Sequence, residues 1–187
     1  FSDYFHTVPS GKDKTYLKTI KFLCQKYDID MILPRSDEEA MVMSACKTEL
    51  MHYGKPFIAC VDFPLMKIVS NKLKTYEHLL KLGIPVADYK VAHSVLELSE
   101  HIDHMLPIYG DLVVKPSDSR GGRGVYVLDE KLRGEELIHK EREMHMSASL
   151  FKNAYLKNYP YFPAIVTQRL LDLVHDFVFL GWRGKPV

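Results

Sequence analysis

The sequence has few cysteines and no long apolar run, and each of these features excludes a class of protein. Its three cysteines, Cys24, Cys46 and Cys60, are odd in number, far apart and without histidines at metal-ligand spacing. We therefore expect reduced thiols in the core rather than a metal site. No apolar run approaches the roughly 18 residues that a membrane span needs, and no signal peptide opens the chain. These features favour a cytoplasmic protein.

The sequence also has almost no net charge. Lys and Arg number 25 against 24 Asp and Glu, which gives a formal net charge of +1. Such a balance provides no general attraction to nucleic acid or to a membrane surface, so we expect neither as a partner. With 187 residues and 47% hydrophobic residues, the chain is long enough to bury a core in one domain or two small ones.

Both ends of the sequence suggest a piece of a longer protein. The chain begins FSDYF and ends GWRGKPV, where the turn from Arg183 to Lys185 should lead into a return strand. We therefore expect the natural protein to extend beyond both ends.

The first third of the chain alternates helices and strands. The pattern predicts a helix over 13–27, a strand over 30–34, a helix that begins at the acidic cap Ser36-Asp37-Glu38-Glu39 and closes at Gly54, and a strand over 56–60. An α-β-α-β order predicts a parallel sheet.

The order of the predicted elements changes near residue 66, which is the predicted domain boundary. A helix begins near Pro64, and Asn71 caps a second helix that ends at Gly83. The pattern then predicts a strand over 88–92, a helix over 94–106, a strand, loop and strand over 112–128, a charged helix over 134–158, and strands over 164–170 and 174–181.

The stretch LVVKPSDSRGGRGVYVL, residues 112–128, places a basic and flexible loop between two strands. Gly121, Gly122 and Gly124 permit the close approach and positive φ angles with which backbone N–H groups surround a phosphate. Lys115 at the end of the first strand adds a point charge, and Arg120 or Arg123 could pair with phosphate oxygens. This combination favours a polyphosphate ligand.

Two other interpretations of the loop remain open. It could be a plain β-hairpin whose glycines only satisfy turn geometry, although residues 117–123 exceed the usual hairpin loop of about two to five residues. It could also be a nucleic-acid segment of the Arg-Gly-Gly type, but only one copy is present. A Walker or Rossmann loop would open a helix, whereas here the strand-forming VYVL follows.

Several ordered motifs resemble those of the ATP-grasp superfamily, most closely the branch of the carbamoyl-phosphate synthase large subunit. The strand Val113-Val114-Lys115-Pro116-Ser117 followed by Gly121-Gly122-Arg123-Gly124 is similar to the family's lysine strand and glycine-rich flap. Upstream, NKLKT (71–75) with LGIPV (82–86) resembles the helix that opens the grasp domain, and DMILP (30–34) with SDEE (36–39) resembles the domain before it.

The resemblance implies an α/β fold. A Rossmann-like pre-ATP-grasp parallel sheet, truncated at its N-terminus, would occupy residues 1–66, and a partial ATP-grasp (α+β) domain, truncated at its C-terminus, would occupy residues 67–187. A nucleotide would lie between the two subdomains, with its adenine in an apolar cleft and its phosphates under the flap.

The resemblance also implies site residues. Lys72 and Lys115 would contact phosphates, and Ser117 with Gly121, Gly122, Arg123 and Gly124 would cover them. The segment from Val166 to Leu171 resembles the hinge that meets adenine through Gln168, Arg169, Leu170 and Leu171. Asp176 or His175 lies where the family has a ribose-binding Glu, although His175 among apolar neighbours suits a structural role better.

Some positions depart from the family pattern. Asn71 stands where Asp is usual, and the hinge Glu is replaced by Gln168 or Arg169. The family's Mg²⁺ ligands lie beyond the end of this chain, so no metal ligand is named, although Mg²⁺ is expected in the intact protein. Other interpretations stay open: Lys72 could be a solvated helix lysine, Gln168 a surface strand residue, and Asp176 a carboxylate at a turn or strand edge.

The resemblance implies an ATP-dependent ligase. Such an enzyme uses ATP to activate a carboxylate, here unknown, as an acyl phosphate that an amine or another nucleophile captures, and a homo-oligomer is possible. The alternative is a nucleotide-binding or interaction module without turnover, which the substitutions in the hinge favour.

Overall fold

The computed structural model describes residues 3–119, 121–140, 143–170, 181–182 and 185–186. The chain divides into two compact units, each described here by itself. Unit 1 comprises Phe1–Val86 with Pro116–Gly121, and unit 2 comprises Ala87–Lys115 with Gly122–Val187. The predicted boundary at residue 66 falls inside helix α4 (Phe63–Val69) of unit 1.

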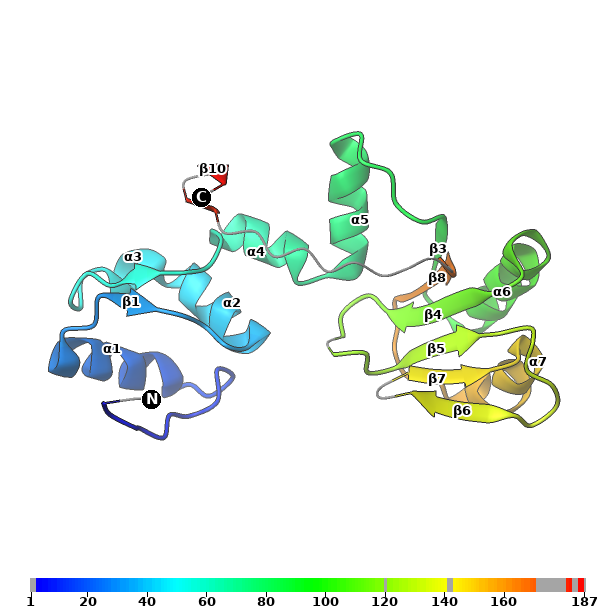
Figure 1. Ribbon diagram of the computed structural model, residues 1–187, viewed down its shortest axis with the longest axis horizontal. Coiled ribbons are helices and arrows are strands. Elements are labelled where there is room, and N and C mark those ends of the chain that lie inside the picture. The colour runs from blue at the N-terminus through cyan, green and yellow to red at the C-terminus, as the bar shows by residue number, and fades with distance from the viewer. Residues whose placement is uncertain (1–2, 120, 141–142, 171–180, 183–184, 187) are drawn as a thin grey trace. The chain divides into compact units, whose positions relative to one another are not determined.

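Unit 1 contains a small parallel sheet with helices around it (Figure 1). Strand β1 (Met31–Ile32) pairs in parallel with β2 (Phe57–Ile58), as the α-β-α-β pattern predicts. Ile32 and Ile58 point into an apolar core formed with the helices, whereas Met31 and Phe57 are exposed on the other face. The helices of this part are α1 (Tyr16–Tyr27), α2 (Asp37–Ala45) and α3 (Lys47–Leu50).

Side-chain caps explain where the helices of unit 1 begin. The Ser36 hydroxyl accepts the N–H of Glu39, and the Glu39 carboxylate accepts the N–H of Ser36, which is a complete capping box at the start of α2. The Asn71 side chain accepts the N–H of Lys74 at 3.0 Å and so starts helix α5 (Lys72–Lys81), as predicted.

Unit 2 is built on a six-stranded mixed sheet with the order β3-β8-β4-β5-β7-β6. Its neighbours β3 and β8, β4 and β5, and β6 and β7 are antiparallel, whereas β5 and β7 are parallel. The strands are β3 (Tyr89–Ala92), β4 (Leu112–Pro116), β5 (Val125–Leu128), β6 (Leu137–Lys140), β7 (Glu143–Met146) and β8 (Ala164–Gln168). A separate antiparallel pair, β9 (Gly181–Trp182) and β10 (Lys185–Pro186), follows.

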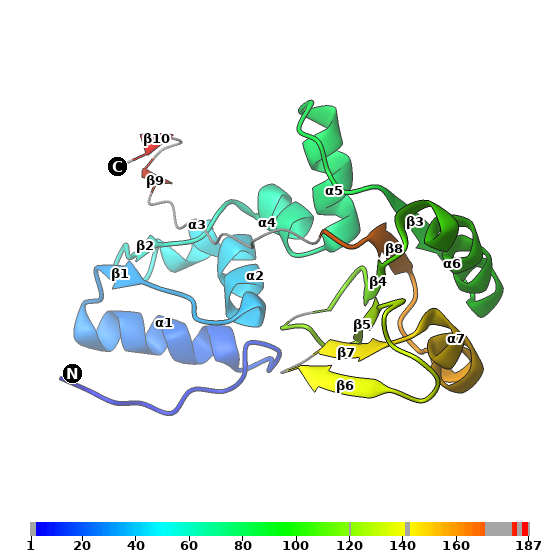
Figure 2. The ribbon, with the colours of Figure 1, turned by 45° about the vertical axis from the view of Figure 1, so that its right-hand side comes forward.

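One face of this sheet carries the main core of unit 2. Helix α6 (Val95–Tyr109) and the helical segment from Ala148 to Asn158 lie on the same side of the sheet (Figures 1 and 2). Alternate strand residues point toward these helices, since Leu112, Val114 and Leu128 are fully buried in a cluster with Phe151 of the helical segment. The helical segment consists of α7 (Ala148–Leu150), a π-helical turn η1 (Phe151–Tyr155) and a 3₁₀ turn η2 (Leu156–Asn158).

The prediction of one charged helix over 134–158 is wrong in its first half. Residues 137–140 and 143–146 form the antiparallel strands β6 and β7, and the helix begins only at Ala148, where the Ser147 hydroxyl caps it by accepting the N–H of Leu150. The reason is a period of two near the end of the hairpin: Met144 and Met146 pack in the core, while His145 between them lies on the other face. Pairing of β7 with β5 outweighs the helix propensity of the charged residues.

The helix predicted from Ser36 to Gly54 is divided at Cys46 into α2 and α3, and the remaining expectations for the elements are met within one to four residues. The strand predicted over 164–170 is β8, and the helix predicted over 94–106 is α6, capped by Ser94. The strand predicted over 174–181 lies almost entirely outside the described residues. Of the described helices, none is long and apolar enough to cross a membrane.

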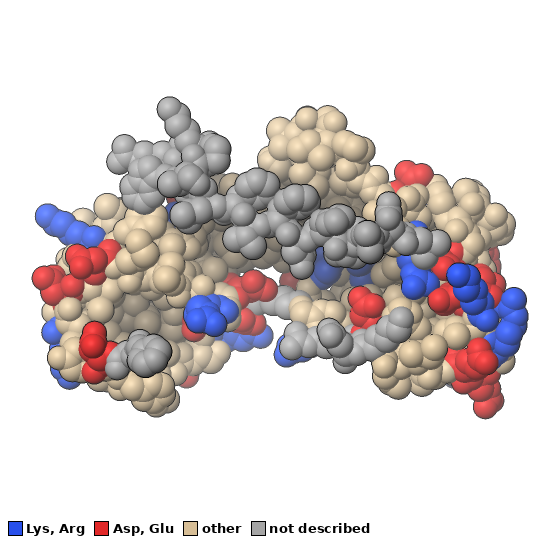
Figure 3. Space-filling view, viewed as in Figure 1, with Lys and Arg blue, Asp and Glu red and all other residues tan. Residues whose placement is uncertain are grey.

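Charge on the face shown in Figure 3 is distributed rather than concentrated. On the face shown in Figure 3, the basic and acidic side chains of the described residues are interspersed. Several of them form ion pairs, such as Lys47 with Asp62 at 2.8 Å in unit 1 and Lys152 with Asp103 at 2.6 Å in unit 2. This pattern agrees with the formal net charge of +1.

Candidate functional site

The glycine-rich loop connects two antiparallel strands, as the sequence predicts. Strands β4 and β5 pair with Leu112 opposite Leu128 and Val114 opposite Tyr126. Within the loop, Gly121, Gly122 and Gly124 have φ angles of 59°, 74° and 73°, which glycine adopts without steric cost. These positive φ angles orient successive backbone N–H groups in directions that a residue with a side chain adopts only with strain. Such an arrangement is suited to a loop that surrounds an anion.

Unit 1 anchors the first half of this loop to the start of helix α5. The backbone N–H of Lys72 donates to the carbonyl oxygen of Ser117 at 2.9 Å, and its ammonium Nζ donates to the carbonyl oxygen of Ser119. Ser117 itself is buried. Lys72, the predicted phosphate ligand, therefore holds the main chain of the loop in this structure.

Unit 2 provides the strand that carries Lys115. In β4 the buried residues Leu112 and Val114 alternate with Val113 and Lys115, which lie on the face away from the helices. The register with β5 places Val127 opposite Val113 on that same face. Lys115, half-buried at the end of β4, thus brings a cation to the point where the glycine-rich loop begins.

The predicted hinge begins within strand β8, which ends at Gln168. The backbone N–H of Gln168 donates to the carbonyl oxygen of Asp88 at 3.1 Å, and that of Arg169 donates to the carbonyl oxygen of Asp111 at 3.1 Å. The main chain of both residues is thereby fixed against its neighbours, and Leu170 is exposed. The predicted site residues Leu171 and Asp176 lie outside the described residues, as does Arg120.

A charge network around Arg169 is a feature that the sequence reasoning missed. Atom Nη1 of Arg169 lies 3.2 Å from Oδ2 of Asp111 and 2.9 Å from Oδ2 of Asp129. The signal that could have found it is the register, since extending the pairing of Leu112 with Leu128 by one residue sets Asp111 opposite Asp129. Two carboxylates in cross-strand positions repel each other, so a cation is expected beside them.

Burial and charge act in opposite directions on the Asp129 carboxyl. Burial raises its pKa, but the backbone N–H of Lys131 and the guanidinium of Arg169 stabilise the carboxylate more strongly. The net result is a pKa below the usual value for aspartate. Asp129 is therefore ionised at neutral pH, as the ion pair with Arg169 requires.

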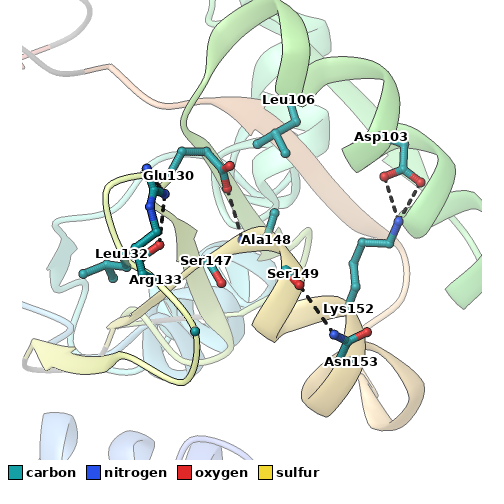
Figure 4. Close-up of a pocket in the computed structure, with 11 residues that line it drawn as sticks. Asp103, Leu106, Glu130, Leu132, Arg133, Ser147, Ala148, Ser149, Lys152 and Asn153 are labelled. Atoms are coloured by element: carbon teal, nitrogen blue, oxygen red, sulfur yellow. Dashed lines mark hydrogen bonds and ion pairs between the residues drawn. The ribbon is translucent and has the colours of Figure 1, made fainter.

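A separate hollow of about 490 Å³ lies on the helix-covered side of unit 2 (Figure 4). Its charged groups are engaged with protein groups: the Lys152 ammonium bonds both carboxylate oxygens of Asp103, and Glu130 accepts the N–H of Ala148. None of the predicted site residues within the described part of the chain lines it. The lining comprises Asp103, Leu106, Glu130, Leu132, Arg133, Gly134, Ser147, Ala148, Ser149, Lys152 and Asn153.

The described part of the chain offers no obvious metal centre. Among those residues, no group of three or more His, Cys, Asp or Glu side chains is arranged to hold a metal ion. The three cysteines are free thiols, and burial raises the pKa of each one. The sequence analysis expects reduced thiols in the core; Cys24 is buried, whereas Cys46 and Cys60 are half-buried.

By sequence, the chain matches no protein-family model and none of the curated proteins. By structure, it is similar to the biotin carboxylase domain of the Hydrogenobacter thermophilus 2-oxoglutarate carboxylase, determined with MgADP, ADP and bicarbonate, at a TM-score of 0.54 and 17% identity over 90% of this chain. It is also similar to an ADP complex of N5-carboxyaminoimidazole ribonucleotide synthetase, at a TM-score of 0.55 and 17% identity over 87% of this chain. A third structure, an L-amino acid ligase from Bacillus licheniformis, matches at a TM-score of 0.53 and 14% identity over 87% of this chain.

These likenesses concern only part of each structure. The chain spans about a third of the length of all three, namely 34%, 35% and 32%. At such low identity they show the fold alone. The antiparallel strands that flank the glycine-rich loop, together with these structural matches, lead to one conclusion: the chain has an ATP-grasp fold.

Proposed function

We propose that this chain binds ATP and forms the nucleotide-binding part of an ATP-dependent ligase. In the proposed reaction a carboxylate attacks the γ-phosphate of ATP and ADP leaves. An amine or another nucleophile then attacks the acyl carbon of the resulting acyl phosphate and displaces inorganic phosphate. The observation that carries the proposal is the loop between β4 and β5, with its positive-φ glycines and with Lys115 where it begins. Two of the similar structures contain ADP, which supports a nucleotide as the ligand.

The proposed residues would act by position and charge. Lys115 and the backbone N–H groups of Gly121, Gly122 and Gly124 would neutralise phosphate charge, with Ser117 and Arg123 nearby in the loop. Lys72 would join them by exchanging its bond to Ser119 for one to a phosphate. Phosphoryl transfer needs mainly such positioning and charge stabilisation, because its transition state has little covalent chemistry for the protein to perform.

The purine and ribose would be bound at the segment that follows β8. Gln168, Arg169, Leu170 and Leu171 would meet the purine through backbone groups, and Asp176 the ribose. Gln168 and Arg169 already use their backbone N–H groups within the protein. Contacts from these two residues would therefore come from their carbonyl oxygens.

Several finer features belong to the same proposal. The chain would belong to the branch of the carbamoyl-phosphate synthase large subunit. The protein would be cytoplasmic, and its active form would be a homo-oligomer. Mg²⁺ would accompany the nucleotide and neutralise its phosphates, since it is usually held by one or two carboxylates together with substrate phosphates.

A second candidate is a nucleotide-binding module without turnover. The observation that favours it is the engagement of Arg169, whose guanidinium is held by Asp111 and Asp129 rather than presented to a ligand. Release of ADP with any of a panel of carboxylates and amines would favour the ligase. Nucleotide binding without ADP release would favour the module.

The decisive first experiment is nucleotide-induced thermal stabilisation. We expect ATP with Mg²⁺ to raise the Tm of the chain, GTP to do so less, and the Lys115→Ala variant to show no increase, because its ammonium no longer neutralises phosphate charge. Lys157→Ala, which removes an exposed lysine of η2, is the matched control and should respond like the wild type. An unchanged response in Lys115→Ala would show that Lys115 is not a phosphate ligand.

A further inference from the structure

Arg169 neutralises two carboxylates that the strand register places opposite each other. Asp111 precedes β4 and Asp129 follows β5, and both lie within 3.2 Å of the same guanidinium nitrogen. All three side chains are largely withdrawn from solvent, with exposed fractions of 12%, 17% and 23% for Asp111, Asp129 and Arg169. At such exposure the charges are weakly screened, so each depends strongly on the others.

The backbone holds both carboxylates in place for Arg169. Oδ1 of Asp111 accepts the N–H of Glu130 at 3.1 Å, and Oδ1 of Asp129 accepts the N–H of Lys131 at 3.0 Å. Each carboxylate therefore uses one oxygen for the main chain and the other for the guanidinium. Such a network is rigid because no member can rotate without losing a charge-assisted hydrogen bond.

The network lies at the far end of the strand that carries Lys115. By strand alternation, Asp111 lies on the same face of the sheet as Val113 and Lys115, away from the helices. Asp111 and Lys115 are four positions apart, which corresponds to about 13 Å along an extended strand.

We propose that Arg169 is a positioning residue, which fixes the main chain from Gln168 to Leu170 so that it meets the purine in a single register. This inference rests on the proposed function. Arg169 would touch the nucleotide through its main chain alone, because its side chain is bound by Asp111 and Asp129, which tie the end of β8 to the start of β4 and the end of β5.

The physical reason is preorganisation. A main-chain segment that reads the edge of a purine distinguishes adenine from guanine only if its donors and acceptors stay at fixed positions. Removing the guanidinium leaves two neighbouring carboxylates without a cation, and their repulsion separates the strand ends that define the segment. Nucleotide affinity and base selectivity should then fall together.

The test compares three variants by calorimetric titration with Mg-ATP and Mg-GTP. Arg169→Met removes the charge, Arg169→Lys keeps a point charge, and Asp129→Asn weakens the network with little change of volume. Lys152→Met is the matched control, because it removes the ion pair with Asp103 within the same unit but away from the network. The free energy of unfolding is measured for each variant.

We expect Arg169→Met to raise the Kd for ATP roughly tenfold, which corresponds to about 1.4 kcal/mol, and to reduce the ratio of the Kd values for GTP and ATP. Arg169→Lys should recover part of both losses, and Asp129→Asn should show a smaller loss of the same kind. Lys152→Met should keep the wild-type Kd and selectivity even if it lowers the free energy of unfolding as much.

The outcomes separate this inference from the proposed function. A wild-type chain that binds no nucleotide would overturn both. Wild-type binding that Arg169→Met and Asp129→Asn leave unchanged would overturn the positioning role alone. If Arg169→Met does not fold, Arg169→Lys and Asp129→Asn carry the test, and unchanged selectivity in both would count against the proposal.

Discussion

The ammonium of Lys72 donates a hydrogen bond to the carbonyl oxygen of Ser119, so the first turn of α5 holds the first half of the glycine-rich loop. The neighbouring bond from the Lys72 N–H to the Ser117 carbonyl oxygen, 2.9 Å long, does not depend on the side chain. Lys72 therefore makes both a backbone and a side-chain hydrogen bond to the loop, and a substitution at Lys72 removes the side-chain bond while keeping the backbone bond. This arrangement allows the contribution of the ammonium to be measured alone.

Lys72→Met should loosen the loop without unfolding unit 1. The variant removes one charged donor and keeps the apolar part of the side chain, which should lower the free energy of unfolding by about 1 kcal/mol. Amide hydrogen exchange over residues 117–119 should become faster than in the wild type. Lys74→Met, which changes an exposed lysine of the same helix, is the control. Equal protection in both variants would show that the ammonium does not hold the loop.

The positive φ angles of the loop predict a selective effect of alanine. Gly122→Ala places a Cβ at a φ of 74° and should cost about 1 kcal/mol in strain. Gly134→Ala is a suitable control, because Gly134 has a φ of 58° with open space around the added Cβ but lies outside the loop. We expect a similar loss of stability in both variants and a loss of ATP-induced thermal stabilisation only in Gly122→Ala. A loss in both would indicate a general effect of backbone strain.

The lowered pKa of Asp129 predicts how the free energy of unfolding of unit 2 depends on pH. Its pKa is lower in the folded state than in the unfolded state, so its stabilisation is present above the unfolded value of about 4 and is lost as the pH falls through the folded value. The difference in free energy of unfolding between the wild type and Asp129→Asn should therefore be largest near pH 7 and shrink below about pH 4. Denaturant titrations at several pH values measure it. In an Arg169→Met background the pH dependence should weaken, because Arg169 is one source of the shift.

The sequence predicted most elements of this fold because local chemistry determines them. Asn71 and Ser94 mark the starts of α5 and α6, and the three glycines mark the loop between β4 and β5. The hairpin β6-β7 was missed because its residues carry many charges, and only pairing with β5 makes them strands. The role of Arg169 was missed for a related reason, since its carboxylate partners are 58 and 40 positions away in the sequence.

The hairpin that the sequence analysis missed can be tested through its core residues. Met146 is fully buried opposite Leu137, whereas Ile138 on the neighbouring strand is 43% exposed. Met146→Ala should lower the free energy of unfolding by about 2–5 kcal/mol, and Ile138→Ala by much less. Denaturant unfolding followed by circular dichroism measures both. Similar losses at the two positions would contradict the period of two that the hairpin requires.

A buried hydroxyl predicts a substitution that does not destabilise the protein. The hydroxyl of Tyr159 has no hydrogen-bond partner within the described part of the chain, and its ring packs between Tyr126, Phe151 and Phe162. Burial also raises the pKa of this phenol well above its usual value, so the group stays neutral. Burying an unpaired hydroxyl costs about 1–3 kcal/mol, and its removal restores much of that free energy.

Tyr159→Phe should therefore leave the free energy of unfolding unchanged or raise it. Tyr109→Phe is the contrasting variant, because the Tyr109 hydroxyl donates to the carboxylate of Asp88 and its loss should destabilise unit 2 modestly. Denaturant titration of both variants at neutral pH compares them directly. A clear loss of stability in Tyr159→Phe would mean that the hydroxyl is satisfied in solution, and a buried water molecule would then be the partner to seek, because such waters bridge buried polar groups in proteins.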